Sequence, residues 1–209
     1  MGYVSLTSYK TGKPLFAGFY PSTIACLEDA IRKETDLSYI DLSHQDLSNG
    51  NFDNACMPFA RMIGANLSGA NLSEACLANG LFHHADLYNT CLCYSDLRAC
   101  DFTDCNFGGT DITGADISFS FFSTLSCFDL DFFNAAHMQG CIFLNTESEA
   151  CEMSFRPIVV KGLLSTPMII FDKQIKIGKT IFSKDIFPSL MQILEDAPLA
   201  IATDPIPKS

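Results

Sequence analysis

Residues 64–77 read GANLSGANLSEACL, and this stretch decides the fold. It contains a unit of five residues: a small residue, Asn or Asp, a large apolar residue, and two variable positions. The same unit continues in both directions and places a large residue at every fifth position from Leu37 to Ile142. Of these 22 positions, 21 hold an apolar residue or Cys, and the exception is His137.

A period of five fits neither a helix, with 3.6 residues per turn, nor a strand, with two. Self-similarity at a fixed period is instead typical of a solenoid. One large and one small apolar residue per unit can both point inward only if the chain turns a corner in every unit. The polar residues between them then face water.

This A(D/N)LXX pattern resembles the pentapeptide-repeat family, and GANLSGANLSEACL and GADIS (residues 114–118) are near-ideal examples of it. The resemblance implies an all-β solenoid, a right-handed quadrilateral β-helix with four units per coil. Residues 36–147 then form about 5.5 coils, and residues 20 apart stack. One inward column is expected to contain Phe82, Phe102, Phe122 and Ile142, and His137 is expected to end another.

Each coil of a solenoid contacts only its neighbours, so both ends need covering. Residues 1–35 predict a β-hairpin, with strands over 3–9 and 14–19, and a capping helix from Ser22 to about Lys33. Three apolar residues of that helix fall on one face: Ile24, Leu27 and Ile31.

Residues 148–195 predict a C-terminal β/α module, and residues 196–209 a loosely ordered tail. Strands are expected over 157–161, 167–171 and 174–182, the last interrupted by Gly178, followed by a helix over 184–195. The arrangement of both ends is similar to that of bacterial and phage-associated members of the family. That similarity implies such a source and a homodimer formed through the module.

The net charge of −11 lies on the repeat, because residues 36–147 contain 14 acidic and two basic residues. Direct binding to nucleic acid is therefore not expected, since phosphate contacts require Lys and Arg. Either the acidity only keeps the rod soluble and follows from the repeat's own preference for Asp, or it forms a partner-binding cluster. The cluster would contain Asp96, Asp101, Asp104, Asp111, Asp116 and Asp131.

The repeat becomes less regular after Ile117, where aromatic residues fall at outward positions. Two interpretations stay open. The C-terminal segment covers these aromatic side chains, or they form an exposed apolar patch that binds a partner. The patch would contain Phe119, Phe121, Phe128 and Phe133.

No combination of residues predicts a catalytic site, a cofactor site or a metal site, and no enzymatic activity is expected. The ten Cys lack metal-ligand spacing, and several replace small inward residues, as buried thiols do. His83 and His84 are expected to be two solvated residues of a turn. With neither a signal peptide nor a membrane span in the sequence, a reducing cytoplasm is the expected location.

Two functions remain at this stage. A rigid rod with regular outward rows suits a protein-interaction scaffold with an unidentified protein partner. The alternative is implied by the family resemblance, since some members mimic duplex DNA and bind bacterial gyrase and other type II topoisomerases. A row of negative charge on a rod would meet that requirement.

Overall fold

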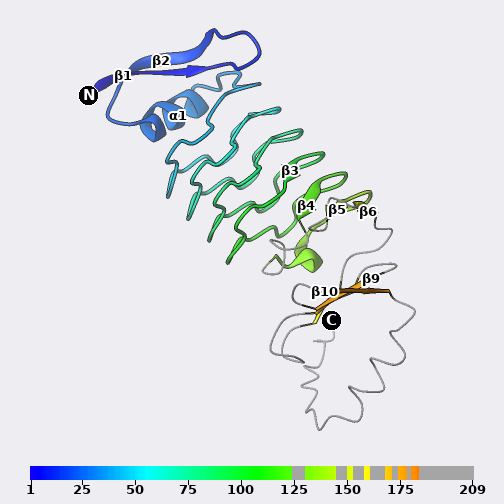
Figure 1. The fold of residues 1–209 in the computed structure, drawn as a ribbon. Helices are drawn as coiled ribbons and strands as arrows, with labels where there is room; N and C mark the ends of the chain where they lie inside the picture. The colour runs from blue at the N-terminus through cyan, green and yellow to red at the C-terminus, as the bar shows by residue number, and fades with distance from the viewer. Residues whose placement is uncertain are drawn as a thin grey trace. The chain divides into compact units, whose positions relative to one another are not determined.

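The computed structural model of the chain describes residues 1–123, 130–144, 150–152, 158–160, 168–170, 174–177 and 180–183. The chain divides into two compact units, Met1–Pro157 and Ile158–Ser209 (Figure 1). The predicted boundaries at 35/36, 147/148 and 195/196 stay predictions.

The first unit begins with a hairpin and one helix, close to the predicted bounds. Strands β1 (Gly2–Thr7) and β2 (Pro14–Tyr20) pair antiparallel, and helix α1 spans Thr23–Arg32. The Ser22 hydroxyl accepts a hydrogen bond from the Ala25 N–H at 3.2 Å, so Ser22 is the N-cap as expected.

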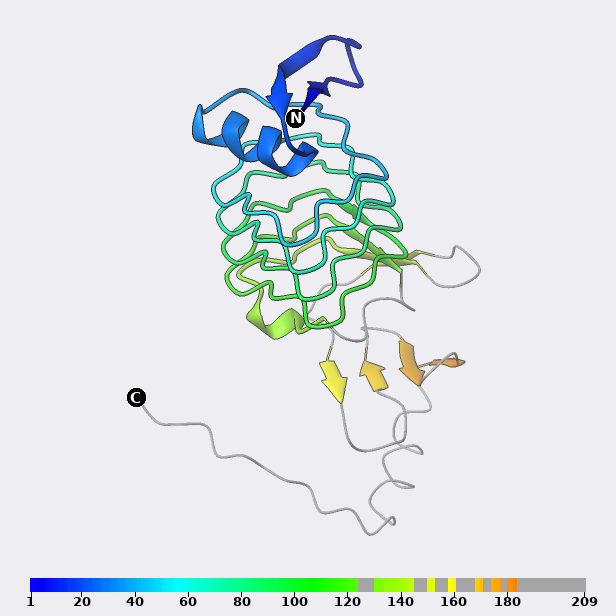
Figure 2. The ribbon, with the colours of Figure 1, turned by 90° about the vertical axis from the view of Figure 1, so that its left-hand side faces the viewer.

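The apolar face of α1 was predicted only in part. Cys26, Leu27 and Ala30 are buried, whereas Ile24 and Ile31 are only half-buried. Helix α1 lies against the first coil of the repeat (Figure 2), and the Glu28 carboxylate accepts a hydrogen bond from the Asn51 N–H at 3.0 Å. The inward face of α1 is therefore formed by Leu27 with the small residues Cys26 and Ala30 beside it.

The repeat forms a solenoid whose coils are joined by parallel bridges between residues 20 apart, such as Asp46 with Asn66 and Asn66 with Asp86. Hydrogen bonds run from coil to coil: the Leu42 N–H donates to the Arg61 carbonyl at 2.7 Å, and the Arg61 N–H donates to the Ile40 carbonyl at 2.8 Å. The corner residue two positions after each large residue adopts a left-handed φ, as Asn49 does at 57°. Asn, Gly and His recur there because they tolerate this conformation.

The interior is a filled column of side chains. Every large residue of the pattern from Leu37 to Phe122 is at most 2% exposed. Phe82 and Phe102 stack with ring centroids 4.9 Å apart, and Phe102 and Phe122 stack at 5.4 Å. The predicted column of three Phe rings is confirmed.

The register changes by one residue beyond Ser118. Asp116 bridges His137 rather than residue 136, and in the parallel pair of β4 (Phe121–Ser123) and β5 (Ile142–Leu144), Phe122 faces Phe143. Phe143 is fully buried and stacks on Phe122 at 5.5 Å. The prediction that His137 and Ile142 point inward was wrong, because the chain inserts one extra residue in this coil.

The extra residue falls in a coil that contains the 3₁₀-helix η2 (Phe132–Asn134) in place of a regular corner. Strand β4 also pairs with β3 (Asp101–Phe102), and β5 pairs antiparallel with β6 (Ala150–Glu152). The predicted cover of the outward aromatic side chains by the C-terminal segment remains a prediction.

The second unit contains a four-stranded antiparallel sheet in the order β10-β9-β8-β7. Its strands are β7 (Ile158–Val160), β8 (Met168–Ile170), β9 (Gln174–Ile177) and β10 (Thr180–Ser183). The single strand predicted over 174–182 is in fact two strands that pair with each other. The predicted helix over 184–195 and tail over 196–209 lie outside the described residues.

Candidate functional site

The four sides of the coil provide a frame for the outward residues. Each side is named here by the outward residues that bridge along it. Side 1 carries Asp96 and Asp116; side 2 carries Asp101 and Phe121; side 3 carries Asp86 and Asn106; side 4 carries Cys91 and Asp111.

The outward Asp and Asn side chains form hydrogen bonds with the backbone of their own units. In almost every unit that has Asp or Asn at this position, the carboxylate or amide oxygen accepts a hydrogen bond from the N–H two residues later, within the corner that it precedes. The donors are Ser38, Ser43, Ser48, Ser68, Ser73, Tyr88, Arg98, Thr103, Gly108, Thr113 and Ser118. This local bond explains why the repeat selects Asp and Asn, independently of any partner.

Side 1 brings two residues of the predicted acidic cluster together, because Asp96 bridges Asp116. Arg98 binds both oxygens of Asp96, with Nε 2.8 Å from Oδ1 and Nη2 2.7 Å from Oδ2. This ion pair lowers the pKa of Asp96, against the opposing effect of partial burial. Asp96 is therefore ionised, and the positive charge of Arg98 compensates its negative charge.

A surface groove of about 300 Å³ follows side 1. Besides Asp96 and Asp116, its lining includes Tyr94, Arg98 and His137. Sequence reasoning did not assign these three residues to the site. The lone Arg among the carboxylates was a visible signal for Arg98, whereas the place of His137 depends on the extra residue in its coil.

The remaining acidic residues lie elsewhere on the surface. Asp101 is on side 2, Asp104 occupies the corner between sides 2 and 3, and Asp111 is on side 4. The Thr113 hydroxyl and N–H lower the pKa of Asp111. Within the described residues the bridges of side 4 end at Asp111, and Asp131 accepts a hydrogen bond from Asn134. The six carboxylates are therefore not one continuous row.

The predicted apolar patch is described in part. Phe119 is 52% exposed at the corner between sides 1 and 2, and Phe121 is 38% exposed on side 2. Phe128 lies outside the described residues, and of Phe133 only the backbone, within η2, is described. Toward the other end, Tyr39 and Phe59 occupy the same corner position as Phe119 and stack at 4.7 Å.

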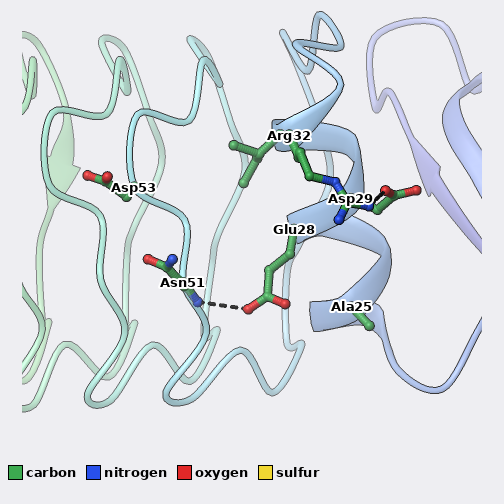
Figure 3. Close-up of a pocket in the computed structure, with 7 residues that line it drawn as sticks. Ala25, Glu28, Asp29, Arg32, Asn51 and Asp53 are labelled. Atoms are coloured by element: carbon green, nitrogen blue, oxygen red, sulfur yellow. Dashed lines mark hydrogen bonds and ion pairs between the residues drawn. The ribbon is translucent and has the colours of Figure 1, made fainter.

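A second groove, of about 450 Å³, lies between α1 and the first coils (Figure 3). Glu28, Asp29, Arg32, Asn51 and Asp53 supply its polar lining. Arg32, together with Lys33, forms an ion pair with Asp29. The Glu28 carboxylate binds the Asn51 backbone and so links α1 to the first coils, whereas the ion pairs of Asp29 lie within α1 and its C-cap.

Four of the described Cys residues are buried, as the sequence predicted for Cys100 and Cys105, whereas Cys141 was expected at an outward position. Cys26, Cys100, Cys105 and Cys141 are at most 2% exposed. The thiols of Cys100 and Cys105 donate to the Leu77 and Phe82 carbonyls at 3.2 and 3.0 Å. Burial raises the pKa of Cys100 and Cys105, so neither is a ready nucleophile or ligand.

The geometry defines a β-solenoid of five-residue units, and the comparisons with known proteins agree. Pentapeptide repeats, in eight copies, match residues 59–80 and 81–118. Residues 59–118 are therefore a segment of pentapeptide repeats. The comparison with curated protein sequences gave no match.

Several solved structures are similar to parts of the chain. A pentapeptide-repeat protein, Rfr23, from the cyanobacterium Cyanothece 51142 is 26% identical over 39% of this chain and 55% of its own, with a TM-score of 0.38. QnrB1, a plasmid-mediated fluoroquinolone resistance protein, is 21% identical over 50% and 51%, with a TM-score of 0.40. The pentapeptide-repeat protein alr5209 from Nostoc PCC 7120 is 24% identical over 50% and 84%, with a TM-score of 0.35. The matched region spans about half the length of Rfr23 and QnrB1.

Within the described part of the chain, no helix is both long enough and apolar enough to cross a bilayer.

Proposed function

We propose that this protein is a non-enzymatic interaction scaffold that binds a protein partner on sides 1 and 2 near Phe119. The supporting observation is the pair of exposed aromatic side chains, Phe119 and Phe121, beside the groove that contains Asp96 and Asp116. Aromatic residues are enriched at protein interfaces, where they supply large buried areas at small entropic loss.

The solenoid suits this role because it presents its surface on a stiff support. Each coil is hydrogen-bonded to the next through its backbone, and the interior is filled by side chains. A preorganised surface loses little conformational freedom on binding. The proposal includes about 5.5 coils, with α1 closing the N-terminal end.

The surface also indicates the chemistry of the partner. Aromatic rings beside carboxylates match a protein segment that combines apolar residues with Lys or Arg. Asp116 lines the groove next to the ion-paired Asp96, and the Tyr94 ring is 67% exposed at its edge. A cationic side chain placed over Tyr94 would gain cation–π attraction as well as charge pairing.

Affinity capture with the full chain tests the scaffold function. Phe119→Asn keeps the left-handed corner, at φ 63°, and removes the aromatic ring. Its matched control is Tyr88→Ser, because Tyr88 is 51% exposed at the diagonally opposite corner, between sides 3 and 4. A protein captured by the wild type and by Tyr88→Ser but lost with Phe119→Asn supports the surface. Equal retention by both variants rejects it.

The alternative, mimicry of duplex DNA toward gyrase, has one supporting feature, the stacked Asp96 and Asp116. Purified gyrase in a supercoiling assay tests it. Inhibition that disappears with Asp96→Asn/Asp116→Asn would support mimicry, and Arg98→Ala should then strengthen the effect by unmasking Asp96. No response at micromolar protein would exclude it.

The homodimer is proposed separately, on the basis that β7 and β10 are the edge strands of the described sheet. Edge strands offer unpaired backbone groups that pair readily with a second copy. Light scattering of the full chain over a hundredfold concentration range tests this, and a constant monomer mass contradicts it.

A further inference from the structure

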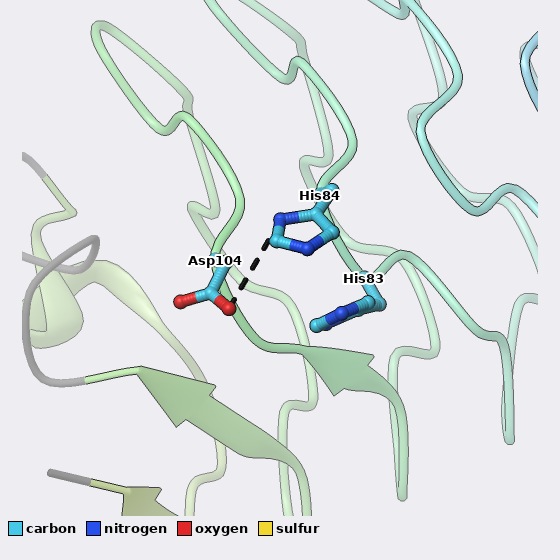
Figure 4. Close-up of side chains that lie close together, drawn as sticks. All are labelled: His83, His84 and Asp104. Carbon is cyan, nitrogen blue, oxygen red and sulfur yellow. Dashed lines mark ion pairs between the residues drawn. The ribbon is translucent and has the colours of Figure 1, made fainter. Parts of the chain in front are cut away.

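Two histidines and one carboxylate meet at the corner between sides 2 and 3. His83, His84 and Asp104 each offer one donor atom, and these three atoms lie within 4.8 Å of one another (Figure 4). The two imidazole rings have centroids 3.9 Å apart, and His84 Nδ1 lies 4.0 Å from Asp104 Oδ2. None of these three residues lines the groove on side 1.

The repeat itself brings the three residues together. His84 and Asp104 occupy the same corner position in successive coils, and both adopt the left-handed conformation, with φ of 59° and 58°. His83 precedes His84, and the next coil places Thr103 opposite it, with His83 Nδ1 2.6 Å from Thr103 Oγ1. A residue separation of 20 thus becomes a contact.

The neighbouring hydrogen bonds fix the tautomer of His83. The Thr103 hydroxyl donates its one proton to Asp101 Oδ1 at 2.6 Å, because an ionised carboxylate can only accept. Thr103 Oγ1 therefore accepts from His83, so Nδ1 of His83 carries the proton. The Nε2 lone pair of His83 is left available, as it is in histidines whose other nitrogen donates to a second group.

The carboxylate is oriented in the same manner. The Ser123 hydroxyl donates to Asp104 Oδ1 at 2.7 Å and accepts from the Asp104 N–H at 2.9 Å. The second oxygen, Oδ2, is the one that faces His84. Asp101, Thr103 and Ser123 thus form a supporting layer behind two of the three donor groups, His83 and Asp104, as second-layer residues do in metal sites.

We propose that His83, His84 and Asp104 bind a divalent first-row transition-metal ion such as Zn²⁺. Two imidazoles and one carboxylate are suitable ligands for such an ion and leave coordination positions open for water. Bonds of about 2.0–2.2 Å require the donors to draw together slightly. His84 and Asp104 are free to do so, since their side chains are 62% and 48% exposed. His83 and His84 lie in a turn, as expected, and the proposal adds a ligand role for their imidazoles.

A titration of the reduced full chain with Co²⁺, followed by visible absorption, tests the site. One equivalent should bind with the spectrum of nitrogen and oxygen ligands. It should lack the thiolate-to-cobalt charge-transfer band that Cys91 and Cys93, with sulfurs 3.2 Å apart, would give. Binding only with that band, or no binding, overturns the proposal.

Two variants locate the ion. His84→Asn keeps the left-handed corner and should weaken Co²⁺ and Zn²⁺ binding at least tenfold, as should Asp104→Asn. The matched control is His44→Asn, since His44 occupies the same corner position two coils earlier, at φ 59°, with Gly64 above it. Zn²⁺ should raise the Tm of the wild type and of His44→Asn but not that of His84→Asn. An equal rise in all three overturns the assignment.

Discussion

Residues 36–118 and the coil that follows them are built from the same five-residue unit, but the two regions differ in the separation of the residues that stack. In the first region every parallel bridge between its own residues joins positions 20 apart, and each predicted inward residue is buried. In the second, Asp116 bridges His137 and Phe122 faces Phe143, so the separation is 21. One added residue moves the chain by one position, so Met138 and Phe143 occupy the inward positions that a strict period gives to His137 and Ile142.

The difference shows which interactions determine the register. The Phe column continues upward through Phe143, whose ring stacks on Phe122 at 5.5 Å and contacts Phe132 edge-on at 5.6 Å. Ile142, at the position that strict periodicity selects, is only half-buried. Packing of the aromatic column therefore overrides the count along the chain.

The largest expected effect concerns Phe143. Phe143→Ala removes a fully buried ring and should destabilise the protein by about 3–5 kcal/mol. Ile142→Ala should have a much smaller effect, because its side chain is partly in water. Denaturant unfolding of the two variants measures both, and a larger loss for Ile142→Ala would restore the uniform period of 20.

A second, smaller effect is expected for the hydroxyls buried at the small inward positions. The Thr110 hydroxyl donates to the Leu87 carbonyl at 2.6 Å, and Thr110→Val should lower the free energy of unfolding by about 1 kcal/mol. Thr113→Val is the matched control in the same unit, since the Thr113 hydroxyl binds the exposed Asp111. Equal losses would mean that burial of the hydroxyl contributes nothing.

The reactivity of buried thiols allows a direct comparison of the regular coils with the shifted coil. Burial raises the pKa of Cys141, in the shifted coil, to about 12, and Cys100, in the regular coils, is also fully buried. Because the thiolate is the nucleophile, both should react at least a hundredfold more slowly at pH 8 than exposed Cys56. Mass spectrometry after alkylation identifies each site. Faster labelling of Cys141 than of Cys100 would show that the shifted coil opens more readily.

The smallest effect on stability is expected N-terminal to the repeat, between β2 and α1. There the Tyr20 hydroxyl donates to Asp29 Oδ2 at 2.5 Å. This bond to Asp29 raises the pKa of Tyr20 to about 12. A raised pKa means that the bond stabilises the fold fully below the ordinary Tyr pKa of about 10, and that this contribution is lost as the pH rises through 12.

Phenolate absorbance of the wild type minus that of Tyr20→Phe isolates this titration. In Asp29→Asn the pKa of Tyr20 should move back toward about 10. An unchanged midpoint of the Tyr20 titration would show that the hydrogen bond to Asp29 does not raise the pKa of Tyr20.

The sequence by itself determined the solenoid, the stacking of residues 20 apart and the Phe column, because a filled core tolerates only one pattern of large and small residues. It also determined the hairpin and the capped helix through Gly12 and Ser22. It predicted the outward positions of Phe119 and Phe121 and the stacking of Asp96 on Asp116, which follow from the same period.

Only the tertiary structure decided the register beyond Ser118, because the choice of Phe143 over Ile142 depends on rings contributed by other coils. It also placed His137 in the groove with Arg98 and Tyr94, and it set the hydrogen bonds from Thr103 and Ser123 behind His83 and Asp104. These arrangements depend on side-chain directions between coils, and a repeat read along one chain does not contain that information.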